Sequence, residues 1–129
     1  MDIIVRISKE KKEKDFRMVV IPSGRDKIGL IQTKDYGIIA YPDKKDFEKI
    51  GEMINWAFNE SDDKVIENSS DTKIEKRFYN CNSYRKVTNN YNMIFFELIE
   101  GIYSISLLKK QGNAFVAFKD ENKEAVEYV

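Results

Sequence analysis

The sequence has no histidine, one cysteine and no net charge over 129 residues. Without histidine it has no imidazole to serve as a near-neutral general base, to complete a Ser/His/Asp or Cys/His pair, or to bind a transition metal. A structural zinc site needs four ligands drawn largely from Cys and His, and only Cys81 is available. Most hydrolase templates are therefore excluded, and we expect a protein without catalytic residues, metal or cofactor.

Other absences narrow the class further. The 22 basic and 22 acidic residues cancel, so there is no global attraction to nucleic acid or to an anionic membrane. No stretch approaches the roughly 18 uninterrupted apolar residues of a membrane-spanning helix, and the apolar start is too short for a signal peptide. A lone cysteine is typical of a reducing compartment. We expect one cytoplasmic domain over residues 1–129, without membrane contact.

The first third of the chain has the pattern of β-structure. Runs rich in β-branched residues cover residues 3–7 and 16–21, with a charged loop between them, and strand-like runs follow at 28–33 and 36–41. Lys34 and Asp35 have the length of a tight hairpin turn between the last two runs. These segments predict an antiparallel meander.

An amphipathic helix is predicted over residues 44–60. Its apolar stripe is spaced at helical intervals, with Asp43 as the N-cap and Asp46 at the third helical position; the stripe comprises Phe47, Ile50, Ile54, Ala57 and Phe58. Gly51 costs roughly 1 kcal/mol relative to alanine inside a helix, which suggests close approach to a sheet. Trp56 lies beside the stripe, where it would cap the edge of the core.

Strands return in the last third of the chain. Ser83 is placed to cap a short helix that carries Tyr84, Val87 and Tyr91 on one face. The runs 92–99, 102–108 and 114–118 then predict two consecutive hairpins, and residues 125–129 add an edge strand or fray. The fold class expected is α+β: an antiparallel sheet of meander and hairpins packed against one long helix, with a short second helix.

An acidic stretch follows the predicted long helix, around a short strand near Val65 and Ile66. Its carboxylates suit a negative surface for a basic protein partner, a cluster for a divalent cation or acid–base work, or a solvated loop; they are Glu60, Asp62, Asp63, Glu67 and Asp71. The EF-hand spacing is absent. The protein-binding surface and the plain loop are therefore favoured over a metal or catalytic role.

A basic and aromatic stretch occupies residues 73–86. Cations for phosphates and rings for stacking are the composition of an RNA-contacting surface; the side chains are Lys73, Lys76, Arg77, Phe78, Tyr79, Tyr84, Arg85 and Lys86. The rings are equally suited to the core, with the cations on the solvent side. An RNA-binding module is the alternative function, with nucleic-acid contact less expected than core packing. Cys81, within the same stretch, is expected to be a structural thiol because no histidine is present to activate it.

The order of the segments resembles a known family. An apolar start at residues 2–7 precedes a helix ending Ile-Asn-Trp-Ala-Phe at 54–58, an aromatic-led link at 78–86, and a closing hairpin over 93–99 and 101–105, followed by 109–115. This resembles the small cytoplasmic immunity proteins of bacterial contact-dependent growth inhibition systems, over about the last two thirds of the chain. Members of this family share a general character more than any sequence motif, so the resemblance assigns a role to no individual position.

The resemblance implies a non-enzymatic inhibitor. Its partner would be the toxic C-terminal domain of a matching effector, often a nuclease such as a tRNase, whose active site it blocks. A nuclease cleft is lined with Lys and Arg, so a competitor needs carboxylates on a rigid frame and an aromatic anchor. The acidic stretch is the predicted partner surface, and Trp56 is the predicted anchor.

Overall fold

The computed structural model describes residues 1–66, 74–111 and 114–117. For residues 109–111 and 114–117 it describes the backbone only. The elements are β1 (Ile3–Glu10), β2 (Met18–Ile21), β3 (Ser23–Arg25), β4 (Ile31–Thr33), β5 (Ile38–Ala40), α1 (Phe47–Glu60), α2 (Ile74–Arg77), α3 (Tyr84–Asn90), β6 (Tyr91–Ile99), β7 (Ile102–Gln111) and β8 (Ala114–Ala117).

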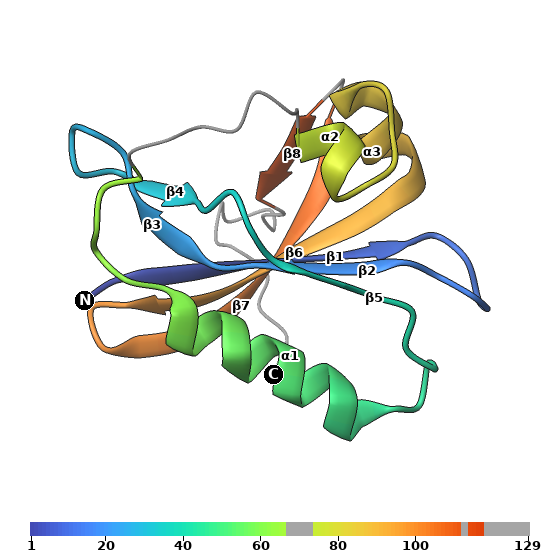
Figure 1. Cartoon of the computed structure of the whole chain (residues 1–129), viewed down its shortest axis with the longest axis horizontal. Helices are drawn as coiled ribbons and strands as arrows, with labels where there is room; N and C mark the ends of the chain where they lie inside the picture. Colours follow the sequence, from blue (N-terminus) through green and yellow to red (C-terminus); the bar gives the residue numbers. More distant parts are fainter. Residues whose placement is uncertain (67–73, 112–113, 118–129) are drawn as a thin grey trace, which may run out of the picture.

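Six strands form one twisted sheet in the order β5-β2-β1-β6-β7-β8, and every neighbouring pair is antiparallel. Helix α1 crosses one face, while α2 and α3 lie over the other (Figure 1). Strands β3 and β4 form a separate two-stranded sheet. The α+β class predicted from the sequence is confirmed. No helix in the described ranges combines the length and apolarity needed to cross a membrane.

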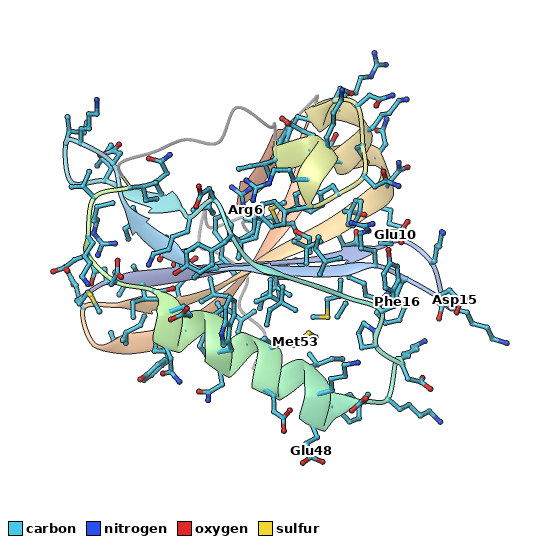
Figure 2. The ribbon with its side chains drawn as sticks, in the orientation of Figure 1. Arg6, Glu10, Asp15, Phe16, Glu48 and Met53 are labelled. Carbon is cyan, nitrogen blue, oxygen red and sulfur yellow. The ribbon has the colours of Figure 1, made fainter. Side chains whose placement is uncertain are left out.

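Alternation along the strands divides the core in two. Side chains on one face of the sheet pack with α1; the buried members of this cluster are Ile3, Val5, Ile7, Phe16, Met18, Val20, Met53 and Ala57. The other face packs with α2 and α3; its buried members are Val19, Ile21, Phe78, Tyr79, Cys81, Val87, Tyr91 and Met93. Figure 2 shows Arg6 and Met53 on opposite sides of the sheet.

The predicted first meander is only partly right. Strand β5 pairs with β2, whereas β4 pairs with β3, so Lys34 and Asp35 do not join a hairpin. The expected run 28–33 is broken because Gly29 has a φ of 89°. The Asp26 carboxylate accepts hydrogen bonds from the amides of Ile28 and Leu30 at 2.9 Å each, which closes a loop before β4 begins.

The long helix exists, but it begins at Phe47, three residues later than expected. Asp46 is the N-cap, and its carboxylate accepts from the Lys49 amide at 3.1 Å. Asp43 instead accepts at its carbonyl from the Asp46 amide, in a turn before the helix. The prediction of Asp43 as the cap is therefore wrong. Both aspartates have cap chemistry, and the turn after the buried Pro42 decides between them.

The second half agrees with the sequence in its hairpins and in the Ser83 cap, but not in every helix: α2 was not predicted, and Tyr91, expected on the short helix, is the first residue of β6. Ser83 caps α3 by accepting from the Lys86 amide, and β6, β7 and β8 form the two hairpins. Val65 makes an isolated bridge with Arg25, at the predicted short strand. The prediction for residues 125–129 falls outside the described part of the chain.

Candidate functional site

The predicted anchor, Trp56, supports another aromatic residue. Its side chain is half-buried against the core cluster beneath the sheet. The Tyr36 ring meets it edge-on, with centroids 6.2 Å apart and planes at 72°. Tyr36 is 39% exposed. The exposed aromatic side chain at this place is therefore Tyr36, held from below by Trp56, and the sequence reasoning missed it because Tyr36 was assigned only to a strand.

Lys34 ties this aromatic pair to the acidic stretch. Its ammonium donates to the Asp62 carboxylate at 2.9 Å, to the Glu60 carbonyl at 2.9 Å and to the Tyr36 hydroxyl at 3.2 Å. The lysine side chain is 12% exposed and the Asp62 side chain 29%. The three bonds fix the Tyr36 ring relative to the end of α1.

The ion pair changes both ionisation equilibria. Partial burial acts to lower the pKa of Lys34, but the hydrogen bonds to Asp62 and Tyr36 outweigh it, and the pKa is raised. The hydrogen bond from Lys34, opposed by partial burial, holds the pKa of the Asp62 carboxyl below its usual range. Both groups are charged at neutral pH, so Asp62 is a neutralised carboxylate and not a free one.

The backbone of the acidic stretch is held along β3. The Asp62 amide donates to the Ser23 carbonyl at 3.0 Å, and the Arg25 amide donates to the Lys64 carbonyl at 2.9 Å. The Ile66 amide then donates to the Arg25 carbonyl at 2.9 Å. Residues 62–66 therefore form a fixed margin and are not a freely solvated loop.

A hollow of about 680 Å³ opens between this margin and Lys34. We call it the Tyr36 surface; it is lined by Lys34, Asp35, Tyr36, Asp62, Lys64, Val65 and Ile66. Glu60 and Asp63 are exposed next to it in the chain, and with them the four acids exceed the two lysines by two charges. The structure thus brings Trp56, Glu60, Asp62 and Asp63 to one region. Glu67 and Asp71 lie outside the described residues.

The basic and aromatic stretch is arranged mainly for packing. Phe78 and Tyr79 are 4% and 2% exposed, so neither ring offers a platform for a base. The Tyr79 hydroxyl shares a 2.8 Å hydrogen bond with Ser8, and its carbonyl accepts from the Tyr91 hydroxyl at 3.0 Å. Cys81 is buried, and its thiol contacts the same carbonyl. Lys73 lies outside the described residues.

Cations of this stretch remain on the surface. Lys76, Arg85 and Lys86 are exposed, while Tyr84 is half-buried. Within residues 1–66, 74–111 and 114–117, no group of three or more Asp, Glu, Cys or His side chains is arranged to hold a metal ion. The Tyr36 surface combines an exposed aromatic ring, a fixed ion pair and a hollow, and it is therefore the candidate site.

Comparison with known proteins yields a single kind of likeness. No family model matches the chain, and no similar curated protein is found. Among solved structures, the chain is similar to a protein of unknown function, NMB0488, from Neisseria meningitidis. The sequence identity is 15%, the TM-score is 0.61, and the alignment covers 92% of this chain and 79% of that chain. A likeness at this identity shows the shared fold alone.

Proposed function

We propose that the chain is a non-enzymatic immunity protein that binds and blocks the toxic C-terminal domain of a matching bacterial effector. The toxin class that fits best is a nuclease such as a tRNase. Two things support the proposal: the resemblance of the segment order to contact-dependent growth inhibition immunity proteins, and the Tyr36 surface. The observation that carries it is the exposed Tyr36 ring, held by Trp56 and Lys34 beside uncompensated carboxylates.

The chemistry of this surface suits a basic cleft. Binding energy in protein interfaces concentrates in a few aromatic and arginine anchors, surrounded by contacts that exclude water. A tyrosine fixed in one position loses little conformational entropy when it is buried. Glu60 and Asp63 are exposed and would accelerate encounter with Lys and Arg of a phosphate-binding cleft.

Truncation of the anchor tests the proposal. The proposal expects a large secreted effector to be encoded immediately upstream of this reading frame. Its purified C-terminal domain is the probe, with affinity measured by calorimetry. We expect Tyr36→Ala to weaken binding by about 30-fold or more, the loss typical of an interface hot spot. Tyr41→Ala is the matched control, because Tyr41 is also an exposed tyrosine but does not line this surface.

Charge reversal separates steering from anchoring. Glu60→Lys with Asp63→Lys removes two exposed acids and spares the Lys34–Asp62 ion pair, so the fold should be retained. Weaker binding with a smaller dependence on salt is expected. Growth rescue completes the test: co-expression of the wild-type chain should protect cells from the same domain. Failure to bind or to protect would refute the proposed function.

A further inference from the structure

Helices α2 and α3, which lie on the side of the sheet opposite α1 (Figure 1), carry an excess of positive charge. Residues 74–90 hold four bases, Lys76, Arg77, Arg85 and Lys86, and one acid, Glu75, which gives them a net charge of +3. The whole chain has no net charge. Positive charge is therefore concentrated on the exposed side chains of residues 74–90, which we call the α2–α3 face.

The cations of this face are not neutralised within the described part of the chain. Lys76, Arg85 and Lys86 are exposed, and no ion pair to any of them is formed among the described residues. Arg77 is half-buried over the ring of Phe78, 5.1 Å from its centroid, and its Nη1 atom is buried without a hydrogen-bond partner among those residues. Unpaired charges of one sign above an apolar layer raise the local potential and attract anions.

Packing fixes the position of these cations. Phe78, Tyr79 and Val87 are buried in the cluster between the sheet and the two helices. Val87 and Thr88 turn one side of α3 inward, and Arg85 and Lys86 of the same helix are exposed. The charged groups therefore stand on a rigid base and not on a flexible tail.

The other exposed polar side chains of this face are amides and a hydroxyl. None of them is acidic; they are Asn80, Asn82, Ser83, Asn89 and Asn90. Asparagine and serine, like arginine and lysine, donate hydrogen bonds to phosphate oxygens. The one carboxylate of residues 74–90 is that of the half-buried Glu75. This composition is suited to phosphate groups.

The loop between β1 and β2 extends the face. The Lys11 amide donates to the Asn90 carbonyl at 2.8 Å, so this loop and the end of α3 are in direct contact. Lys11 is exposed and forms no ion pair among the described residues, so it adds a fourth exposed cation to the three of α2 and α3. The other charges of the loop are matched: Lys12 contacts Glu10 at 3.6 Å, Glu13 contacts Lys44 at 2.7 Å, and Lys14 adjoins Asp15.

The aromatic rings of this stretch do not offer a stacking platform. Phe78 and Tyr79 are buried and Tyr84 is half-buried. Proteins that bind single-stranded nucleic acid combine cations with exposed rings on which the bases stack. Contacts to the sugar–phosphate backbone alone suit a duplex, whose phosphates form regular rows while its bases are stacked inside.

We infer that the α2–α3 face binds the phosphate backbone of a nucleic-acid duplex without reading its base sequence. The four exposed cations contact phosphates, and the asparagine side chains add hydrogen bonds to the same backbone. This goes beyond the proposed function, because the Tyr36 surface is acidic, belongs to other elements and takes a basic protein partner. Duplex binding at the α2–α3 face requires no toxin.

Fluorescence anisotropy tests the inference on the full-length chain. The probes are labelled RNA and DNA duplexes of about 20 base pairs, at about 20 mM salt. We expect binding whose logarithmic affinity falls against the logarithm of the salt concentration with a slope of about −3 to −4, as four neutralised phosphates imply. Binding of either duplex supports the inference. Poly-glutamate of equal charge should compete at least tenfold less well than unlabelled duplex, because it is flexible and lacks rows of phosphates.

Two triple variants of equal charge locate the contact. Lys76→Gln with Arg85→Gln and Lys86→Gln removes exposed cations that form no ion pair among the described residues, so the fold should be retained. Duplex binding should weaken at least tenfold, and the salt slope should fall to about −1. The matched control removes three exposed lysines of the β3–β4 loop and the start of α1, and it should bind within about threefold of wild type; it is Lys27→Gln with Lys45→Gln and Lys49→Gln.

Three results would overturn the inference: no duplex binding by the wild-type chain, equal losses in the two triple variants, or equal competition by poly-glutamate. The last result would identify an acidic protein as the occupant of the face. None of these outcomes depends on whether the toxin domain binds, so the two proposals fail separately.

Discussion

At the scale of single residues, Lys34 organises the candidate site. One ammonium contacts the side chain of Asp62, the hydroxyl of Tyr36 and the carbonyl that ends α1 at Glu60. Glu60 and Asp62 lie together at the end of α1, and Tyr36 is two residues from Lys34, so the lysine joins two distant parts of the chain. A lysine in this position does more for geometry than for stability, because partly exposed ion pairs contribute about 0.2–1 kcal/mol.

The Lys34–Asp62 ion pair predicts how the stability of the protein responds to low pH. The folded pKa of Asp62 is below its ordinary value of 3.8, so its contribution to stability is present above that pH and is lost as the pH falls through the folded pKa. We expect Lys34→Met to move the Asp62 pKa back toward 3.8, as measured by carbon-13 NMR of the carboxyl group. Lys64→Met is the comparison: it keeps the Lys64 backbone hydrogen bond to Asp62 and removes only a minor charge effect, so it should raise the Asp62 pKa less than Lys34→Met does. An unchanged Asp62 pKa in Lys34→Met would contradict the role given to the pair.

Part of the site was predictable at this scale. The sequence placed Trp56 at the helix edge and marked the acids as a partner surface, and Trp56, Glu60, Asp62 and Asp63 do lie in one region. Lys34 was read as a turn residue. Its role depends on a contact 28 residues away along the chain. Local pattern carries no information about such a contact.

At the scale of elements, the start of α1 separates two aspartates of identical chemistry. Asp46 accepts the Lys49 amide, whereas no side-chain bond from Asp43 to the helix is found among the described residues. We expect Asp46→Ala to lower the free energy of unfolding by about 1 kcal/mol and Asp43→Ala by only a few tenths, measured by urea denaturation. The reverse order would show that the helix begins earlier.

Gly51 makes a prediction of opposite sign. Because a Cβ atom there would meet no neighbour within 4 Å, Gly51→Ala should raise the free energy of unfolding by about 1 kcal/mol, the helix-propensity difference. Thermal and urea denaturation measure it. The expectation that Gly51 allows close approach of α1 to the sheet is therefore wrong. Destabilisation of the variant would show that the glycine serves internal packing after all.

Element types were easier to predict than strand partners. The 3.6-residue stripe identified α1, and the glycine-marked turns identified the β6–β7–β8 hairpins, because both signals are local. The pairing of β5 with β2 joins strands separated by the whole β3–β4 excursion. Nothing within residues 28–41 distinguishes that pairing from a simple hairpin. The predicted hairpin between runs 28–33 and 36–41 was therefore wrong.

At the scale of the whole molecule, the sheet is the middle layer between two unlike cores. The cluster beneath α1 is aliphatic with one buried phenylalanine, Phe16, whereas the cluster under α2 and α3 encloses two tyrosines. The Tyr79 and Tyr91 rings pack edge-on at 4.9 Å. Among the described residues, buried tyrosines occur only in the cluster under α2 and α3. We therefore expect this cluster to make the stability of the protein sensitive to alkaline pH.

Burial raises the pKa of both tyrosine hydroxyls above the ordinary value of 10.0. Above pH 10 the unfolded chain therefore releases protons that the folded protein retains, and the free energy of unfolding falls as the pH rises through the raised values, by up to about 1.4 kcal/mol per pH unit for each tyrosine. Urea denaturation from pH 8 to pH 11, followed by circular dichroism, measures this slope.

Tyr79→Phe with Tyr91→Phe should flatten the slope. The double variant also loses the Ser8 and backbone hydrogen bonds, at a cost of about 1 kcal/mol each, which lowers stability at every pH without tilting the curve. Tyr103→Phe is the control, because Tyr103 is exposed and belongs to neither buried cluster. The lysines contribute the same background to all three proteins. If the double variant kept the wild-type slope, the alkaline sensitivity would lie outside the layer beneath α2 and α3.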